Sequence, residues 1–337
     1  MRAVVFDAPR QLSLQEVAEP VCAADEVVIR TCRAGLCGTD LHIFRDEYMS
    51  TYPLIPGHEF VGEVHQVGRD VVAFHVGQRV AADPNLYCGR CDFCRNRRHN
   101  HCDNWQGIGI NRSGAFAEYV SVPAAACYGV PQSMSDTEAA FIEPVSCVVH
   151  AMNRLSMAAG DNAVVFGAGP MGALLIQALR HRGAAMLVAV DKQESRLSTA
   201  RELGATETIV AGPDLPRQLR RIAPRGFDVV VDATGVLEAI LHGLEMLGPC
   251  GRFLQFGVAP RDAAITLRPY DVFRNDWTIL GSFALCYTFE QAIAWMTSGV
   301  IKVEPLVSHC LPLDEFAAAF DTFERGETMK VHFRFDR

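Results

Sequence analysis

The stretch Phe166-Gly167-Ala168-Gly169-Pro170-Met171-Gly172 decides the fold of the second half of this 337-residue chain. It lies between an apolar run, 163–166, which predicts a strand, and a run rich in alanine and leucine, 171–182, which predicts a helix. In a GxGxxG turn the first glycine permits a tight bend, the second lets a pyrophosphate approach the backbone, and the third lets helix and strand pack closely. The pattern therefore predicts a dinucleotide at the start of the helix, bound by Gly167, Gly169, Pro170, Met171 and Gly172.

Strand-like and helix-like runs alternate from 162 to 283, which predicts a doubly wound parallel sheet in an α/β domain. Asp191 ends the next predicted strand, nineteen residues after Gly172. A carboxylate at this position binds the adenosine ribose hydroxyls and repels a 2′-phosphate. The sequence therefore favours NAD over NADP, although Lys192 and Arg196 follow closely enough to leave NADP open.

Residues 1–147 have a different pattern, in which short β-forming runs such as 3–6, 26–29 and 60–67 are separated by Gly, Pro and Asp. This pattern predicts a compact, barrel-like β domain. The tail after 285 is not needed to complete the parallel sheet, so we expect it to return to the β domain. The predicted organisation is a β domain at 1–147, a nucleotide-binding domain at 148–285 and a C-terminal return at 286–337.

Four of the twelve cysteines follow the spacing C-x2-C-x2-C-x7-C, and they are Cys88, Cys91, Cys94 and Cys102. Thiolates spaced this closely are typical of a closed, tetrahedral structural zinc site. Such an ion would fix a loop that has little core of its own, and it would leave no coordination position for chemistry. A redox-active Cys-x-x-Cys pair is the alternative interpretation.

A second set of metal ligands is offered by Gly35-Leu-Cys37-Gly-Thr-Asp40 and Gly57-His58-Glu59-Phe60. Cys37 lies between Gly35 and Gly38 in a predicted loop, and His58-Glu59 follows a Pro-Gly turn at the start of a predicted strand. A thiolate, an imidazole and a carboxylate are ligand types that zinc accepts. The alternative is a buried cysteine and an unrelated surface pair, since single Cys and His residues are common in cores.

The bulk properties narrow the class of protein. The formal charge is −8 with a pI near 5.8, and the one basic run, 95–101, is short, so the sequence gives no electrostatic case for nucleic acid. No apolar run approaches the roughly 20 residues of a membrane span, and the N-terminus does not resemble a signal sequence. We therefore expect a cytoplasmic protein with a small-molecule substrate, and a zinc-ribbon nucleic-acid binder is the rival from another class.

Together the two ligand motifs, the four cysteines and the glycine turn with Asp191 resemble the zinc-dependent medium-chain dehydrogenase/reductase family over essentially the whole chain. The resemblance implies a GroES-like catalytic β domain, a Rossmann NAD-binding domain and two Zn²⁺ per chain, one catalytic and one structural. It also implies a homo-oligomer, a dimer or more specifically a tetramer, formed through an edge strand of the Rossmann sheet such as 277–283.

The same resemblance assigns roles to individual residues. Cys37 and His58 would bind the catalytic zinc with Glu59 beside it, and either Glu143 or Cys147 would complete the ligand shell, with Glu143 favoured. Thr39 and His42 match a hydroxyl-to-imidazole proton relay. The weaker matches are Arg196 at the adenosine ribose, Lys330 at the pyrophosphate, and Val258 and Phe283 at the nicotinamide amide.

These roles predict an NAD-dependent oxidation of a secondary alcohol, most specifically a sugar alcohol, to the ketose. The polyol choice rests on Glu143-Pro144, which resembles polyol dehydrogenases, and on Leu41-His-Ile-Phe44, which resembles bacterial polyol and threonine dehydrogenases. Ala284 stands where sorbitol dehydrogenases carry an arginine, so a shorter or differently configured polyol stays open. L-Threonine 3-dehydrogenase is the enzymatic rival because Gly109-Ile-Asn-Arg-Ser-Gly114 is similar to that branch. A metal-free quinone reductase of the same fold would lack both cysteine sets.

Overall fold

The computed structural model describes residues 1–335, which form two compact units. The first contains 1–146, 286–297 and 303–335, and the second contains 147–285 and 298–302. The segment 298–302 belongs to the second unit because the Gln177 side chain binds the Lys302 backbone twice: Lys302 N–H donates to Oε1 at 2.8 Å, and Nε2 donates to the Lys302 carbonyl at 3.0 Å. The predicted C-terminal return, 286–337, includes 298–302, so the two divisions of the chain differ at this segment.

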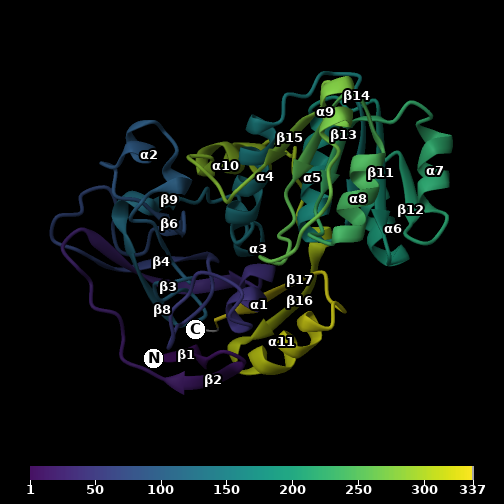
Figure 1. Cartoon of the computed structure of the whole chain (residues 1–337). Helices are drawn as coiled ribbons and strands as arrows, with labels where there is room; N and C mark the ends of the chain where they lie inside the picture. Colours follow the sequence, from purple (N-terminus) through teal and green to yellow (C-terminus); the bar gives the residue numbers. More distant parts are fainter. Residues whose placement is uncertain (336–337) are drawn as a thin grey trace. The chain divides into compact units, whose positions relative to one another are not determined.

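The second unit is built on a six-stranded parallel sheet with the strand order β12-β11-β10-β13-β14-β15 (Figure 1). Its strands are β10 (Asn162–Phe166), β11 (Met186–Asp191), β12 (Glu207–Val210), β13 (Phe227–Asp232), β14 (Leu247–Gln255) and β15 (Thr278–Gly281). Its helices are α5 (Pro170–His181), α6 (Glu194–Glu202), α7 (Leu215–Ile222), α8 (Leu237–Glu245) and α9 (Pro269–Arg274). The predicted doubly wound sheet is confirmed.

The strand order of this sheet places β10 at the point where the order reverses, between β11 and β13. Ala163, Val164 and Val165 of β10 are fully buried, as expected for a central parallel strand that is covered on both faces. In open α/β sheets the carboxyl end of a strand at such a reversal is where ligands bind. The glycine turn that begins at Gly167 follows β10 directly, so the topology brings it to that position.

The first unit contains a seven-stranded sheet along the path β16-β17-β3-β4-β5-β9, with β8 also paired to β3. The strands of this sheet are β3 (Glu26–Gly35), β4 (Glu59–Val67), β5 (Arg79–Ala82), β8 (Tyr119–Pro123), β9 (Cys127–Gly129), β16 (Val307–Pro312) and β17 (Lys330–Arg334). Two smaller ladders join β1 (Arg2–Ala8) to β2 (Gln11–Glu16) and β6 (Asn85–Leu86) to β7 (Gln106–Gly107). The helices are α1 (Gly38–Phe44), α2 (Asp92–Arg95), α3 (Asp136–Ala139), α10 (Phe289–Thr297) and α11 (Phe316–Glu324), and α4 (Ile142–Arg154) begins in this unit.

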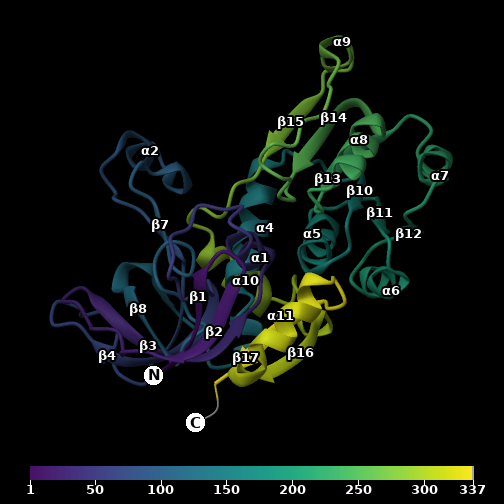
Figure 2. The ribbon, with the colours of Figure 1, turned by 60° about the horizontal axis from the view of Figure 1, so that its bottom comes forward.

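The C-terminal segment completes the first unit. Strand β17 pairs in antiparallel register with β3, so that Phe333 lies opposite Ala34. Phe316 and Phe320 of α11 are buried with Phe333 in a core that also contains Phe6. In both ribbon views the C-terminal elements, drawn in yellow, lie beside the N-terminal strands (Figures 1 and 2). The tail therefore supplies two strands and much of the aromatic core of the first unit.

None of the helices in residues 1–335 is both long enough and apolar enough to cross a membrane.

Candidate metal and nucleotide sites

The four cysteines of the predicted structural site come together in the first unit. Atoms of Cys88, Cys91, Cys94 and Cys102 that could bind a metal lie within 4.8 Å of one another. Backbone N–H groups of the same loop point at the sulfurs, as in the 3.4 Å contact from Cys91 N–H to Cys88 Sγ and the 3.5 Å contact from Cys94 N–H to Cys91 Sγ. Such N–H groups lower the pKa of the Cys88 thiol to about 6.

Burial has the opposite effect on Cys94, because it raises the pKa of that thiol to about 12. A full set of four thiolates therefore requires the charge of a cation among them. The donor set and its spacing fit Zn²⁺ in a closed tetrahedral site. We refer to residues 88–102 as the cysteine lobe.

The second predicted ligand group also comes together. Cys37, His58 and Glu59 place one ligand atom each within 4.8 Å of the others. Cys37 is the N-cap of α1, and His58 and Glu59 stand where the chain enters β4. The turn into β4 requires Gly57, whose φ is +98° and where a Cβ would lie 2.8 Å from the backbone nitrogen of Phe116.

Asp40 orients this group, and the sequence did not assign it a role. Its carboxylate is fully buried, accepts a 2.9 Å hydrogen bond from Cys37 N–H, and places Oδ1 3.5 Å from His58 Nδ1. Burial opposes protonation of His58, yet Asp40 and Cys37 outweigh it and raise the pKa of the imidazole well above its usual value. A carboxylate on one ring nitrogen leaves the other for a metal, which is the usual arrangement of a ligating histidine. The available signal was an acidic residue three positions after Cys37.

Lys330 lies beside the same ligand group. Its side chain is only 3% exposed, its ammonium forms an ion pair with Glu59, and it lies 5.8 Å from the centre of the Phe141 ring. Gly35 leaves room for the pair, because a Cβ there would lie 2.4 Å from Glu59 Oε2. Lys330 is therefore the partner of a candidate metal ligand, and its contact with a pyrophosphate stays a prediction.

Glu143 and Cys147 both lie on α4, four residues apart, and hence near the same helix face. Burial raises the pKa of Glu143 to about 7, and the charges of His58 and Glu59 lower and raise it respectively. Among the described residues neither Glu143 nor Cys147 joins the close group of ligand atoms. Neither residue's role as a ligand is tested by this arrangement, and both stay predictions.

The predicted proton relay lies along α1. Thr39 Oγ1 is 3.7 Å from Cys37 Sγ, and His42 follows three residues later on the same helix. His42 Nδ1 is 2.8 Å from Glu47 Oε2, a carboxylate that the sequence did not single out. The hydroxyl therefore lies at the ligand group, and the imidazole is held by an acid next to solvent. The relay itself stays a prediction.

Three of the predicted nucleotide-binding residues of the second unit, Gly167, Gly169 and Asp191, line a hollow of about 720 Å³. Gly167 has φ +95°, and a Cβ on Gly172 would lie 1.9 Å from the Gly167 carbonyl oxygen, so both positions require glycine. Gly169 is the N-cap of α5, and Pro170 and Met171 form its first turn with no acidic side chain in it. The helix therefore presents free N–H groups and its positive end to a phosphate.

Asp191 is held at the edge of this hollow by two backbone N–H groups, from Ala168 at 2.8 Å and from Gln193 at 2.9 Å. Arg196 Nη1 lies 4.0 Å from its carboxylate, and Lys192 lines the same hollow. The predicted ribose-binding acid is therefore accompanied by two cations. Val258 and Phe283, which are 56% and 36% exposed, do not line this hollow, and their nicotinamide contacts stay predictions.

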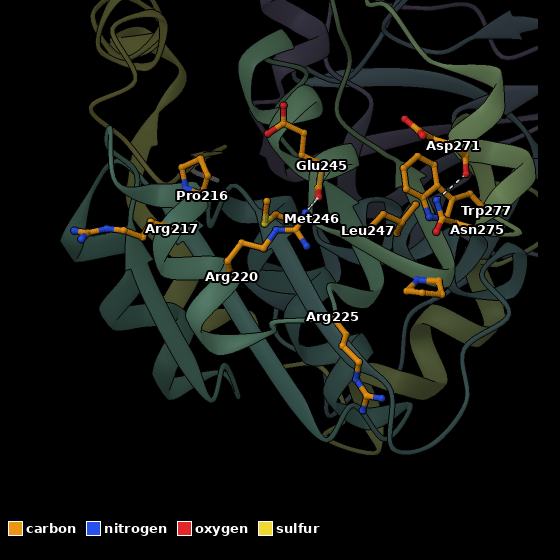
Figure 3. Close-up of a pocket in the computed structure, with 11 residues that line it drawn as sticks. Pro216, Arg217, Arg220, Arg225, Glu245, Met246, Leu247, Asp271, Asn275 and Trp277 are labelled. Carbon is orange, nitrogen blue, oxygen red and sulfur yellow. Dashed lines mark hydrogen bonds between the residues drawn. The ribbon is translucent and has the colours of Figure 1, made fainter.

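A second hollow of the second unit, of about 690 Å³, lies at the amino ends of β13, β14 and β15 of the same sheet. Figure 3 shows three arginines from α7 and the loop after it, Arg217, Arg220 and Arg225, with Trp277 on the other side. Arg225, Leu247 and Trp277 stand at or before the first residues of β13, β14 and β15. Ligands of open α/β sheets bind outside the carboxyl ends of the strands, so of these two hollows the one at Gly167 has the position expected of a nucleotide site.

Comparison with known proteins identifies the family of this chain. Residues 23–132 match the family described as "Alcohol dehydrogenase GroES-like domain", and residues 170–298 match "Zinc-binding dehydrogenase". The chain belongs to the zinc-binding medium-chain dehydrogenase family, whose members are NAD(P)-dependent oxidoreductases that act on CH–OH groups. The predictions of family, fold and enzyme class are confirmed.

Three relatives show the range of substrates in similar chains. D-altritol 5-dehydrogenase of Agrobacterium fabrum is 36% identical over 99% of this chain and 99% of its own. D-arabinitol dehydrogenase 1 of Uromyces fabae is 32% identical over 98% and 96%. L-Threonine 3-dehydrogenase of Idiomarina loihiensis is 31% identical over 96% of each chain. The comparison therefore supports the dehydrogenase class without choosing between polyols and threonine.

Two solved structures have the same fold with a TM-score of 0.93 over 99% of both chains. One is a zinc-binding dehydrogenase from Sinorhizobium meliloti 1021, which is 30% identical and bound to NADP. The other is an alcohol dehydrogenase from E. coli CFT073, which is 29% identical and complexed with NADH. Both nicotinamide cofactors thus occur among proteins of this fold.

Proposed function

We propose that this protein oxidises a secondary hydroxyl group of a sugar alcohol to the ketone, with NAD as hydride acceptor, and so forms a ketose. The observation that carries the proposal is the group of Cys37, His58 and Glu59, with the Glu143 charge close by. Thiolate, imidazole and carboxylate in one place are a mixed ligand set of the kind that leaves a zinc position open to substrate. The relatives named for D-altritol and D-arabinitol favour a polyol.

Zinc in this group would supply a Lewis acid for the hydroxyl oxygen, and bound nicotinamide would accept the hydride. Cys37 and His58 would hold the metal, and Asp40 would fix the orientation of the His58 ring. We favour Glu59 and Glu143 over Cys147 as the further ligands. The ion pair with Lys330 would keep the Glu59 carboxylate off the zinc when other ligands fill the zinc shell, and would release the carboxylate when a ligand is missing.

The hydroxyl proton would leave through Thr39 and His42. Thr39 lies beside the Cys37 sulfur, and His42 contacts Glu47, so the path runs from the ligand group towards an acid on the surface. An imidazole is suited to accept a proton near neutral pH.

We also propose that NAD is the preferred cofactor. The support is Asp191, which faces the nucleotide hollow with both carboxylate oxygens held by backbone N–H groups. Lys192 and Arg196 reduce this preference because they could accept a 2′-phosphate. Asp191→Ala should therefore raise the NADP-to-NAD ratio of kcat/KM by about tenfold, the size of a single interaction near 1.4 kcal/mol. Glu194→Gln, an exposed change on α6, is the matched control.

The test of the function is the initial rate of NADH formation by the zinc-loaded enzyme. The panel contains polyols of four to six carbons, simple secondary alcohols and L-threonine, each with NAD and with NADP, before and after removal of zinc. Polyol-dependent reduction of NAD that is lost with the metal is the expected result. Turnover of L-threonine alone would keep the dehydrogenase class and overturn the substrate.

L-Threonine is the second candidate because of the relatives and because of the motif 109–114. The packing of that motif weakens its value as a substrate signal. A Cβ on Gly109 or on Gly114 would lie 2.3 or 2.2 Å from the Gly57 carbonyl oxygen, in the turn that presents His58. The two glycines are thus needed to build the metal site whichever alcohol binds there, so we keep the polyol as the proposed substrate.

A further inference from the structure

A cluster of three polar aromatic side chains in the first unit has no role in the function proposed so far. Tyr287 and His99 share a hydrogen bond between the phenol oxygen and Nε2, and their ring centres are 4.2 Å apart. Tyr87 packs edge-on against both, with centres 4.5 Å from His99 and 5.5 Å from Tyr287. His99 comes from the cysteine lobe, Tyr87 from the residue before it, and Tyr287 from the segment between β15 and α10.

The three members differ in exposure. His99 is only 7% exposed, and its Nδ1 has no hydrogen-bond partner among residues 1–335. Burial lowers the pKa of this imidazole, which favours the neutral ring. Tyr287 is 47% exposed, so part of its side chain is open to solvent, while its hydroxyl is held by the buried His99 ring. A phenol hydroxyl can donate one hydrogen bond and accept others, as the hydroxyl groups of a polyol require.

The backbone around Tyr287 is held in an uncommon conformation. Ala284 and Tyr287 have φ angles of +52° and +53°, a region that costs residues other than glycine of the order of 1 kcal/mol or more. Two contacts hold the segment in place: the Cys286 thiol lies 3.6 Å from the Arg97 carbonyl, and Thr288 Oγ1 donates to the Ser146 carbonyl at 2.8 Å. The segment is therefore fixed to the cysteine lobe on one side and to α4 on the other.

Both the cysteine lobe and α4, to which the segment is fixed, are connected through the chain to the candidate catalytic group. Ser146 lies three residues after Glu143 on α4. Asp83 follows β5, which runs antiparallel to β4, so Asp83 leaves the sheet at the end where β4 begins with Glu59. The chain then reaches Tyr87 in four residues. The Asp83 charge also acts on both Glu143 and Tyr87. The cluster is thus joined to the candidate catalytic site by two short connections, through Ser146 and through Asp83, within the same unit.

We propose that Tyr287 is a specificity-determining residue whose hydroxyl binds a polyol hydroxyl away from the reacting carbon, and that His99 is the residue that positions it. This inference rests on the proposed function. It gives the cysteine lobe a part in substrate selection, because the lobe supplies the imidazole that orients the phenol. A simple secondary alcohol has no second hydroxyl and gains nothing from this contact.

The test compares the best polyol of the panel with 2-butanol in the zinc-loaded enzyme. Tyr287→Phe keeps the ring and removes the hydroxyl, so kcat/KM for the polyol should fall about tenfold, through KM, as expected for a lost hydrogen bond of substrate. The value for 2-butanol should change less than twofold. His99→Phe should give the same selective loss, and the double variant should lose no more than either single one, since both remove one interaction.

Tyr270→Phe, a change at an exposed tyrosine of α9, is the control and should leave both substrates unaffected. Zinc content of two per chain shows that the lobe is intact in each variant, and Tyr287→Phe alone carries the test if His99→Phe loses zinc. An equal loss on both substrates, or no loss on the polyol, overturns the inference and leaves the proposed function standing. A wild-type enzyme that oxidises no polyol overturns the proposed function and the inference together.

Discussion

The two cysteine-containing sites of the first unit are assembled in different ways. All four sulfur ligands of the cysteine lobe come from residues 88–102, and loop N–H groups support them. The group at Cys37 draws its ligand atoms from the start of α1 and the start of β4, and it is completed by Asp40 and by Lys330 of β17. A closed site of identical ligands can thus be local, whereas a site that must hold a metal and still accept substrate is built from several parts of the sheet.

The largest effect should come from Cys37→Ser. Loss of this thiolate should reduce zinc from two to one per chain and lower kcat by at least about a thousandfold, because a Lewis acid supplies several kcal/mol of transition-state stabilisation. The far-ultraviolet circular dichroism spectrum should be unchanged. Zinc content and initial rates of the same preparation check this, with Cys22→Ser as the control for a cysteine outside both sites. Retained activity with one zinc would show that Cys37 is not a catalytic ligand.

Cys94→Ser should also remove one zinc but act first on structure. Metal binding and folding of a small loop are coupled, so the cysteine lobe should open while the sheet of the first unit remains. Hydrogen exchange of residues 88–102 should lose its protection, and protection of β3 and β4 should persist. Activity should fall less than in Cys37→Ser. A variant whose whole first unit unfolds would mean that the lobe is not the independent part that its local ligands suggest.

The same contrast explains how much could be predicted from the sequence. The lobe and the glycine turn could be predicted because their residues lie close together in the chain, at spacings typical of each kind of site. The ion pair of Lys330 with Glu59 was not, because it depends on β17 pairing with β3 and on β3 pairing with β4. The choice between Glu143 and Cys147 stayed open because a helix puts both near one face.

Asp40→Asn should have an intermediate effect. The amide keeps the shape of the side chain but no longer holds the His58 ring with a full negative charge, so affinity for the catalytic zinc should fall about 10- to 100-fold. Competition with a chelator, followed for each of the two zinc ions, measures this. Asp46→Asn, at an exposed position with φ +61°, is a matched control. Unchanged affinity would mean that the contact at 3.5 Å is only incidental.

Asp83→Asn, in the segment that joins the two sites, should have the smallest effect on the reaction. Its measurable effect should be on the pH dependence of stability. Burial raises the pKa of this carboxyl from 3.8 to about 6, against two hydrogen bonds from Asn85 that lower it. The folded state therefore holds a proton that the unfolded state releases, so the free energy of unfolding should fall as pH rises from about 4 to about 6 and then level off. At about 1.4 kcal/mol per pKa unit, the fall is about 2 to 3 kcal/mol.

An asparagine at position 83 does not titrate and can accept the same two hydrogen bonds, so this part of the pH dependence should disappear in the variant. Urea unfolding of both proteins at several pH values between 4 and 8 measures the difference, in which the titration of the zinc ligands cancels. Parallel curves would show that the Asp83 carboxylate is already ionised in the folded protein at pH 4, so that burial does not raise its pKa.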